Sequence, residues 1–176
     1  MDVVGFDALH GKTSAVSMDG TDAQAPIEGV RVRPVRPVPH DDGTLAEVAR
    51  ASWEEIDEPI VQVHVTSTLA GRTRAWSLHK RSVDRLFVVS GLVSLVVFDG
   101  RTDSPTFGAV NKFTLSDRNP ALVVIPPLLY HGYKNIGASE TFLLNMPTEQ
   151  YEYDEPDAFH LSYDSSEAAA LIPFRW

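Results

Sequence analysis

Apolar and polar residues alternate with a period of two through most of the chain after residue 60. This alternation begins in IVQVHVTST, and further apolar runs follow in RAWSLH, RLFVVSGLVSLVVFDGR, FGAVNKFTLSD, ALVVIPP and TFLLNMP. Successive side chains of a strand point to opposite faces, so the pattern predicts strands that bury one face. Gly, Pro, Asn and Asp interrupt the runs about every ten residues, which is typical of a β-sandwich or barrel. We therefore predict an all-β domain.

The segments before and after these strands differ from them in pattern. Residues 1–26 are weakly periodic and predict an N-terminal arm that precedes the domain at 27–176. Residues 30–38 interleave valines with arginines and contain prolines, which predicts an extended strand at a sheet edge. Residues 44–56 have helical spacing and predict one short helix. The aromatic and acidic residues 151–176 predict a tail that packs on the strands.

Composition narrows the classes of function. The chain has 176 residues, a formal net charge of −9 and 43% hydrophobic residues, so it predicts a globular domain rather than a nucleic-acid binder. There is no cysteine, which excludes disulfides, thiolate metal sites and a cysteine nucleophile. No apolar run approaches the roughly 20 residues of a membrane span, and the first residues do not resemble a secretory signal. The expected location is the cytoplasm.

Two short patterns carry candidate chemistry. His79 ends one predicted strand, and a turn-like segment leads to Asp84 at the start of the next. Farther on, Pro126, His131 and Asn135 stand in the order P-x-x-x-x-H-x-x-x-N. These spacings resemble the two conserved segments of the cupin superfamily, which folds as a small double-stranded β-helix, or jelly-roll barrel. The resemblance implies that these side chains point into a barrel.

The same resemblance opens a metal-binding interpretation. In the metal-binding form of the pattern, a His-x-His pair and a Glu in the first segment join a His in the second. Here Ser77 replaces one histidine and Asp84 replaces the glutamate. His79, Asp84 and His131 remain as two imidazoles and one carboxylate, a set that can hold a divalent metal with open positions.

A more specific resemblance covers residues 27–176. The strings DGRTDSPTFG (99–108), IPPLLYHGY (125–133) and the closing YDSS…IPFRW resemble the dTDP-4-dehydrorhamnose 3,5-epimerase family, itself a cupin. Similarity extends upstream to IEGV (27–30). This resemblance implies a homodimer of jelly-roll barrels, with N-terminal strands crossing to the partner, and a nucleotide-sugar substrate with no cofactor.

The family abstracts protons next to a 4-keto group, at C3 and C5 of a nucleotide-linked sugar, with a histidine base held by an aspartate. His79 falls at the position of that base, in SLH, and Asp164, in SYDSS, falls at the position of its aspartate partner. His131 falls at the second active-site histidine. A carboxylate bonded to imidazole fixes its tautomer and raises its basicity. The resemblance further implies substrate contacts at Glu47, Gln62, Trp76 and Asn145.

Several family positions carry other residues in this chain. The tyrosine acid of the family corresponds to Leu144, or to Asn145 if the register slips by one residue. Its three cations correspond to Trp76, Asp84 and Asp42. These losses weaken the expected contacts to a diphosphate and to an oxyanion.

Three functions therefore remain open from the sequence. The chain is predicted to be an isomerase of the 3,5-epimerase type. The alternatives are a metal-dependent oxygenase or lyase that uses His79, Asp84 and His131, and a sugar-nucleotide-binding cupin without catalysis. We expect no tightly bound metal, because Asp164 has a role only in the isomerase. The same Asp164 could instead form an Asx-turn or a helix N-cap.

Overall fold

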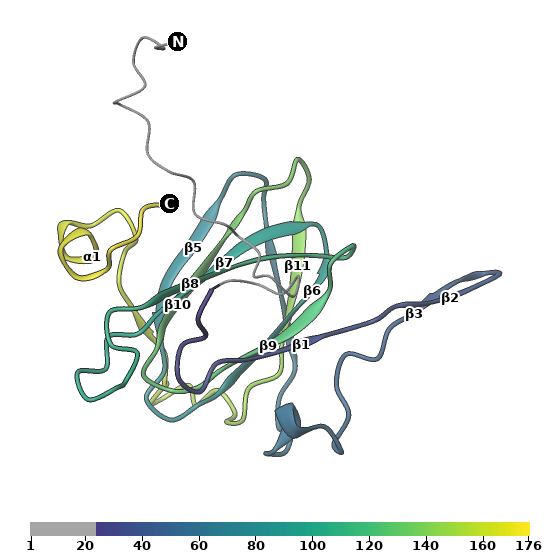
Figure 1. The fold of residues 1–176 in the computed structure, drawn as a ribbon, viewed down its shortest axis with the longest axis horizontal. Coiled ribbons are helices and arrows are strands. Elements are labelled where there is room, and N and C mark those ends of the chain that lie inside the picture. The colour runs from purple at the N-terminus through teal and green to yellow at the C-terminus, as the bar shows by residue number, and fades with distance from the viewer. Residues whose placement is uncertain (1–23) are drawn as a thin grey trace, which may run out of the picture.

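Two antiparallel five-stranded sheets pack face to face and form the body of the protein (Figure 1). The computed structural model describes residues 24–176, so the predicted arm at 1–26 lies almost entirely outside the described residues. The first sheet contains, in spatial order, β1 (Arg31–Pro34), β9 (Ala121–Ile125), β6 (Asp84–Ser90), β11 (Thr141–Asn145) and β4 (His64–Thr68). The second contains β12 (Phe159–His160), β5 (Thr73–Leu78), β10 (Tyr130–Asn135), β7 (Leu92–Phe98) and β8 (Val110–Ser116).

The order of strands confirms the predicted all-β jelly-roll class, because neighbours in each sheet come from distant parts of the chain. Strands β6 and β7 follow each other in sequence but lie in different sheets, and Gly91 connects them. Gly91 has φ of +95°, and a Cβ added there would collide with Thr141. Only glycine fits this crossing without strain.

The core lies between the sheets and follows the period-two pattern. Side chains that point inward from both sheets form one buried cluster, which includes Val88, Val93, Leu95, Val123 and Leu143. The outward faces are also covered. Residues around Ile56 pack on the first sheet, and the C-terminal tail packs on the second.

The predicted aromatic tail is confirmed. The ring of Trp176 lies 5.0 Å from that of Trp76, and Phe174 contacts the same indole edge-on at 6.1 Å. The tail contains one helix, α1 (Ser166–Leu171), which the sequence reading did not predict. Its N-cap is Ser165, whose hydroxyl accepts a hydrogen bond from the backbone N–H of Ala168.

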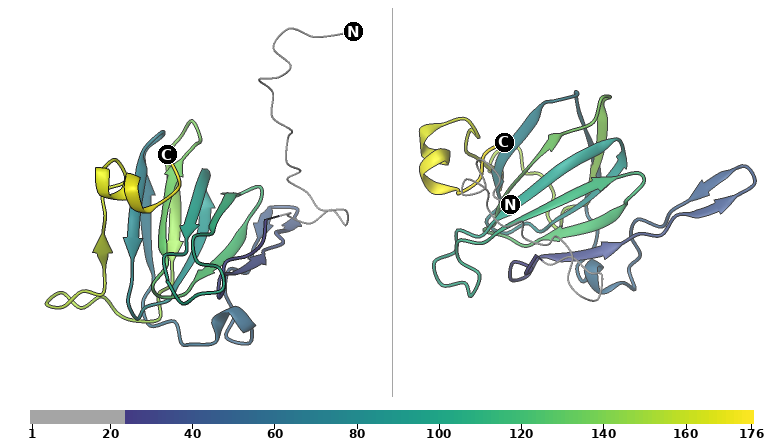
Figure 2. Two further views of the ribbon diagram at one scale, coloured as in Figure 1. Left: turned by 60° about the vertical axis from the view of Figure 1, so that its left-hand side comes forward. Right: turned by 45° about the horizontal axis from the view of Figure 1, so that its top comes forward.

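The prediction of a helix over 44–56 is wrong. The chain forms a hairpin of β2 (Val38–His40) and β3 (Gly43–Leu45), and only the short 3-10 helix η2 (Glu54–Ile56) follows. The apolar side chains of this region pack on the outer face of the first sheet instead of on one helical stripe. The hairpin projects away from the sheets in Figure 1 and in the right panel of Figure 2. Strand β1 lies at a sheet edge, as predicted.

Among residues 24–176, no helix has the length and apolar character needed to cross a membrane.

Candidate functional site

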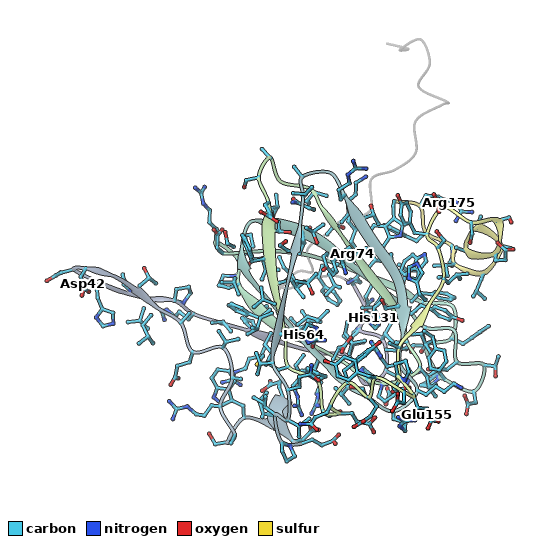
Figure 3. All side chains as sticks on the ribbon, turned by 180° about the vertical axis from the view of Figure 1, so that it is seen from behind. Asp42, His64, Arg74, His131, Glu155 and Arg175 are labelled. Atoms are coloured by element: carbon cyan, nitrogen blue, oxygen red, sulfur yellow. The ribbon has the colours of Figure 1, made fainter. Side chains whose placement is uncertain are left out.

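Two adjoining pockets, of about 270 and 330 Å³, lie at the polar end of the space between the sheets. Both are lined by His64, His79, Asp84, Asn145 and Tyr151, and we call the two pockets together the site cavity. In Figure 3, the labelled His64, Arg74 and His131 lie on the strands of the main body, whereas Asp42 marks the distant hairpin.

Strand periodicity brings the polar residues to this cavity. Asp84, Leu86 and Val88 alternate along β6, with the apolar pair continuing into the core and the carboxylate at the cavity end. His131 is the second residue of β10 and Asn145 is the last residue of β11, and both line the cavity. The three strands thus place one carboxylate, one imidazole and one amide together.

Asp84 is the centre of the cluster. Its Oδ2 lies 3.3 Å from Nε2 of His79 and 3.0 Å from Nε2 of His131, and its Oδ1 accepts a hydrogen bond of 2.8 Å from the side-chain amide of Asn145. The Asn145 oxygen in turn accepts from the backbone N–H of Arg85 at 3.1 Å. The two imidazole rings are stacked with centroids 5.5 Å apart. One carboxylate oxygen therefore serves both histidines.

Backbone carbonyls hold the other side of each imidazole. Nδ1 of His79 contacts the carbonyl oxygen of Asp157, and Nδ1 of His131 lies 3.1 Å from that of Leu129. The Asp157 carboxylate accepts bonds of 2.8 to 2.9 Å from three consecutive backbone N–H groups, those of Lys80, Arg81 and Ser82. The loop that carries Asp157 is thereby fastened to the segment between the two strands, and the orientation of His79 is fixed.

The surroundings shift two pKa values in opposite directions. Burial alone would lower the pKa of His79, but its contacts with Asp84 and with the Asp157 carbonyl outweigh burial and raise the pKa to about 9. Burial alone would raise the pKa of Asp84, but the two histidines hold it far below its usual range. The cluster therefore favours an ionised carboxylate with positive charge beside it.

Asp164 does not hold His79, which corrects the predicted dyad. Its carboxylate is exposed and accepts a hydrogen bond of 2.6 Å from the hydroxyl of Ser162, next to the cap of helix α1. In this structure the ring nitrogens of His79 face oxygens of Asp84 and Asp157 instead. The turn and cap reading of Asp164 fits its position better.

Trp76 is also absent from the lining of the site cavity. Between β5 and β10 the register shifts, so that Tyr133 pairs with Arg74 whereas His131 pairs with Ser77. The extra residue in β5 reverses the alternation, which is the usual effect of a β-bulge. Trp76 precedes the inward Ser77 and packs under the C-terminal tail on the outer face, and the bulge brings Arg74 into the lining of the cavity beside Ser77.

Of the other residues predicted to contact substrate, Gln62 and Asn145 line the site cavity and Glu47 does not. Gln62 lines the cavity, and its side-chain oxygen accepts a hydrogen bond of 2.8 Å from the backbone N–H of Tyr151. Glu47 is exposed, pairs with Arg50 and does not line the cavity. Asn145 lines the cavity, and its side-chain amide donates a hydrogen bond to Asp84. The expected contact between Glu47 and the substrate has no support within a single chain.

Four cavity residues were missed by the sequence reading. His64 shares a period-two spacing with Thr66 and Thr68, and this spacing places it on the inward face. Arg74 was hidden by the bulge in β5. Asp157 and Tyr151 lie in the aromatic and acidic segment 151–176, and nothing in its local pattern distinguishes them.

The fold and the buried imidazole–carboxylate cluster define a protein of the cupin class. Comparison with known proteins is more specific: the chain belongs to the dTDP-4-dehydrorhamnose 3,5-epimerase family, whose sequence model matches residues 24–170. The predicted membership in this family of isomerases is thus confirmed.

Three relatives illustrate the match. The probable low-salt glycan biosynthesis epimerase Agl13 of Haloferax volcanii is 32% identical over 78% of this chain and 89% of its own length. The spore coat polysaccharide biosynthesis protein SpsL of Bacillus subtilis is 29% identical over 85% of this chain and 96% of its own length. The structure of a dTDP sugar isomerase from Desulfovibrio desulfuricans superposes with a TM-score of 0.77 at 24% identity, covering 85% of this chain and 92% of that one.

Proposed function

We propose that this protein is an epimerase that acts on a nucleotide-linked 4-keto-6-deoxy sugar and moves a proton at a carbon next to the ketone. The observation that carries the proposal is the pair of imidazoles on one buried carboxylate, inside a cavity of a chain that belongs to an epimerase family. A base next to a cavity of this kind can remove a proton that a neighbouring ketone makes acidic.

His79 is the proposed base. Its side chain is 20% exposed, against 8% for His131 and 6% for Asp84, so it is the member of the cluster most open to a substrate. In the proposed step, the neutral form of His79 takes the proton from carbon through Nε2, and the electron pair of the broken bond moves to the ketone oxygen as an enolate. Asp84 lies beside the ring and stabilises the imidazolium that forms. Because the pKa of His79 is raised to about 9, this neutral base is the minority form at neutral pH, and exchange is expected to become faster as the pH rises toward that value.

Return of a proton to the opposite face of the sugar completes an inversion and needs an acid. Leu144 does not line the site cavity, and Asn145 is engaged by Asp84, so neither position of the family tyrosine supplies one. We assign this role to Tyr151. It lines both pockets, and its hydroxyl makes no hydrogen bond with the residues that the structure describes.

Arg74 is the proposed contact for the diphosphate of the substrate. It lines the larger pocket and forms no ion pair or hydrogen bond through its guanidinium with the described residues. A guanidinium presents a fixed fork of donors that suits phosphate oxygens. Arg74 would then supply one of the cations that are missing from the family's positions.

Solvent exchange tests the proposal directly. In D₂O, incubation with dTDP-4-keto-6-deoxyglucose is expected to place deuterium at a carbon next to the ketone, which mass spectrometry and NMR detect. Tyr151→Phe is expected to retain exchange at the face that His79 reaches while losing most of the inverted product, because only the acid is removed. Binding of the sugar nucleotide without exchange at any carbon would contradict catalysis and leave a binding protein.

We also propose that the protein is a homodimer and that the β2–β3 hairpin contributes to the contact. Val38 and Leu45 pair across this hairpin, and their side chains are 48% and 54% exposed in the single chain. Apolar groups exposed on a projecting hairpin favour association. Sedimentation at micromolar concentration is expected to show one species of twice 19.4 kDa. A double Val38→Asp, Leu45→Asp variant should dissociate, and a monomer in the unmodified chain would contradict the proposal.

A further inference from the structure

We infer that His64 is a further catalytic residue, whose imidazole N–H donates a hydrogen bond to the ketone oxygen of the sugar while negative charge develops there. This role rests on the proposed function and deepens it, since it names the group that stabilises the enolate. Three features of the site cavity support it: the need for a donor, the free nitrogens of His64, and the position of His64 on the opposite sheet from His79.

The cavity needs a donor because its charged lining opposes an enolate. Removal of a proton from the carbon next to a ketone leaves negative charge on the ketone oxygen. Asp84, Glu149 and Asp157 line the smaller pocket, and none of the lysines and arginines in the described part of the chain lines it. An enolate beside carboxylates is stabilised only if a hydrogen-bond donor is already aimed at its oxygen.

His64 is a donor of the cavity that still lacks a partner and a task. The side-chain amide of Asn145 donates to Asp84 at 2.8 Å. Arg74 and Tyr151 are the proposed contact for the diphosphate and the proposed acid. The imidazole of His64 lines both pockets, and within residues 24–176 its ring nitrogens have no hydrogen bond and no ion pair.

Strand pairing places His64 beside the base cluster but on another wall of the cavity. His64, labelled in Figure 3, is the first residue of β4 and the Cα partner of Asn145 on β11. Directly paired residues of antiparallel strands have Cβ atoms about 4.5 to 5.5 Å apart on one face. Asn145 binds Asp84, which lies 3.3 Å from His79. The first sheet thus supplies His64, whereas His79 follows β5 of the second sheet, and a sugar in the cavity contacts both imidazoles.

An imidazole can stabilise the enolate without transferring a proton. Even a neutral ring carries one N–H, which can donate to the ketone oxygen. In the proposed step the proton goes from carbon to Nε2 of His79, the electron pair of the C–H bond moves to the ketone oxygen, and His64 keeps its own proton. A neutral imidazole held in place beforehand is an effective partner for such a charge.

His64→Phe and His64→Gln test this role by kinetics. Phenylalanine fills similar space without a donor, whereas glutamine retains an N–H. We expect His64→Phe to lower kcat for solvent exchange by roughly 10²-fold to 10³-fold, the usual cost of one oxyanion donor, and His64→Gln to recover most of the rate. The dissociation constant of dTDP-4-keto-6-deoxyglucose should change by less than about threefold, because the hydrogen bond strengthens only as charge develops. His160→Ala is the control, since His160 lies outside the site cavity.

A spectroscopic measurement tests the hydrogen bond without turnover. In His79→Ala the proposed base is absent, so the bound keto-sugar is expected to remain intact. With ¹³C at the ketone carbon, a hydrogen bond from His64 should move the NMR resonance of the bound ketone downfield from that of the free ketone. Adding His64→Phe in the same background should remove this shift.

Three results would overturn the inference. These are a full exchange rate in correctly folded His64→Phe, a ketone resonance in His79→Ala that equals that of the free ketone, and a shift that disappears in Gln62→Leu but not in His64→Phe. The second result decides the question even if His64→Phe does not fold.

The two proposals fail separately. A ketone shift that depends on His64, in a protein that exchanges no deuterium, contradicts the epimerase and leaves the hydrogen bond in place. Exchange that does not respond to His64→Phe removes only the role of His64. A protein that does not bind the keto-sugar contradicts both.

Discussion

Replacing His79 by alanine is expected to lower kcat for solvent exchange and epimerisation by roughly 10²-fold or more, the usual contribution of a positioned acid–base group. The reason is geometric: His79 is the member of the cluster most open to the cavity, and its two ring nitrogens are fixed by Asp84 and by the Asp157 carbonyl. Exchange of deuterium, followed by mass spectrometry in the presence of a chelator, measures the loss.

His160→Ala is the control for this variant. His160 lies on β12, is exposed and does not line the site cavity, so its removal should leave the rate within about twofold, as expected for a surface change away from the site. Thermal unfolding of both variants shows whether the alanine at 79 has damaged the fold. A correctly folded His79→Ala protein with the full rate would assign proton abstraction to another group.

Much of the fold could be predicted because strand periodicity is a local property of the sequence. The second half of the alternating segment 60–68 forms β4, and the buried runs of β6, β7 and β9 are strands, with turns at glycine and proline. The failure at 44–56 has a tertiary cause. Helical spacing in a short segment is weak, and contacts with the first sheet outweigh it.

The candidate site was predicted in part. Period-two spacing and the segment patterns brought His79, Asp84 and His131 to one place, since each falls at the cavity end of a strand. The prediction that Asp164 bonds to His79 was wrong, because the position of an aspartate in a motif does not determine which carboxylate lies beside the imidazole. In this chain Asp84 is a closer carboxylate beside His79.

Two other features had no signal in the sequence. The bulge in β5 reverses the direction of Arg74, and a single inserted residue in a strand leaves the alternation on either side unchanged. The contact between Asp157 and His79 spans 78 residues and depends on how the acidic loop folds back onto the segment that follows β5. Contacts of this kind are properties of the packed molecule.

The free energy of unfolding is expected to fall as pH rises between 6.5 and about 9, the interval in which His79 is protonated in the folded state but not in the unfolded one. A histidine whose pKa is raised by folding stabilises the fold fully below its unfolded pKa, and this contribution disappears as pH passes the folded value. The shift corresponds to roughly 3 kcal/mol of unfolding free energy.

Urea denaturation at several pH values across this interval, with a chelator present, measures the decline. Because the pKa of Asp84 is lowered, its contribution to the free energy of unfolding is lost only at acid pH. This contribution is therefore constant across the interval in which His79 titrates. Asp84→Asn is the informative variant: it removes the charge that holds the proton on His79, and the decline should become much smaller. An equally steep decline in Asp84→Asn would show that the charge on His79 is set by other groups.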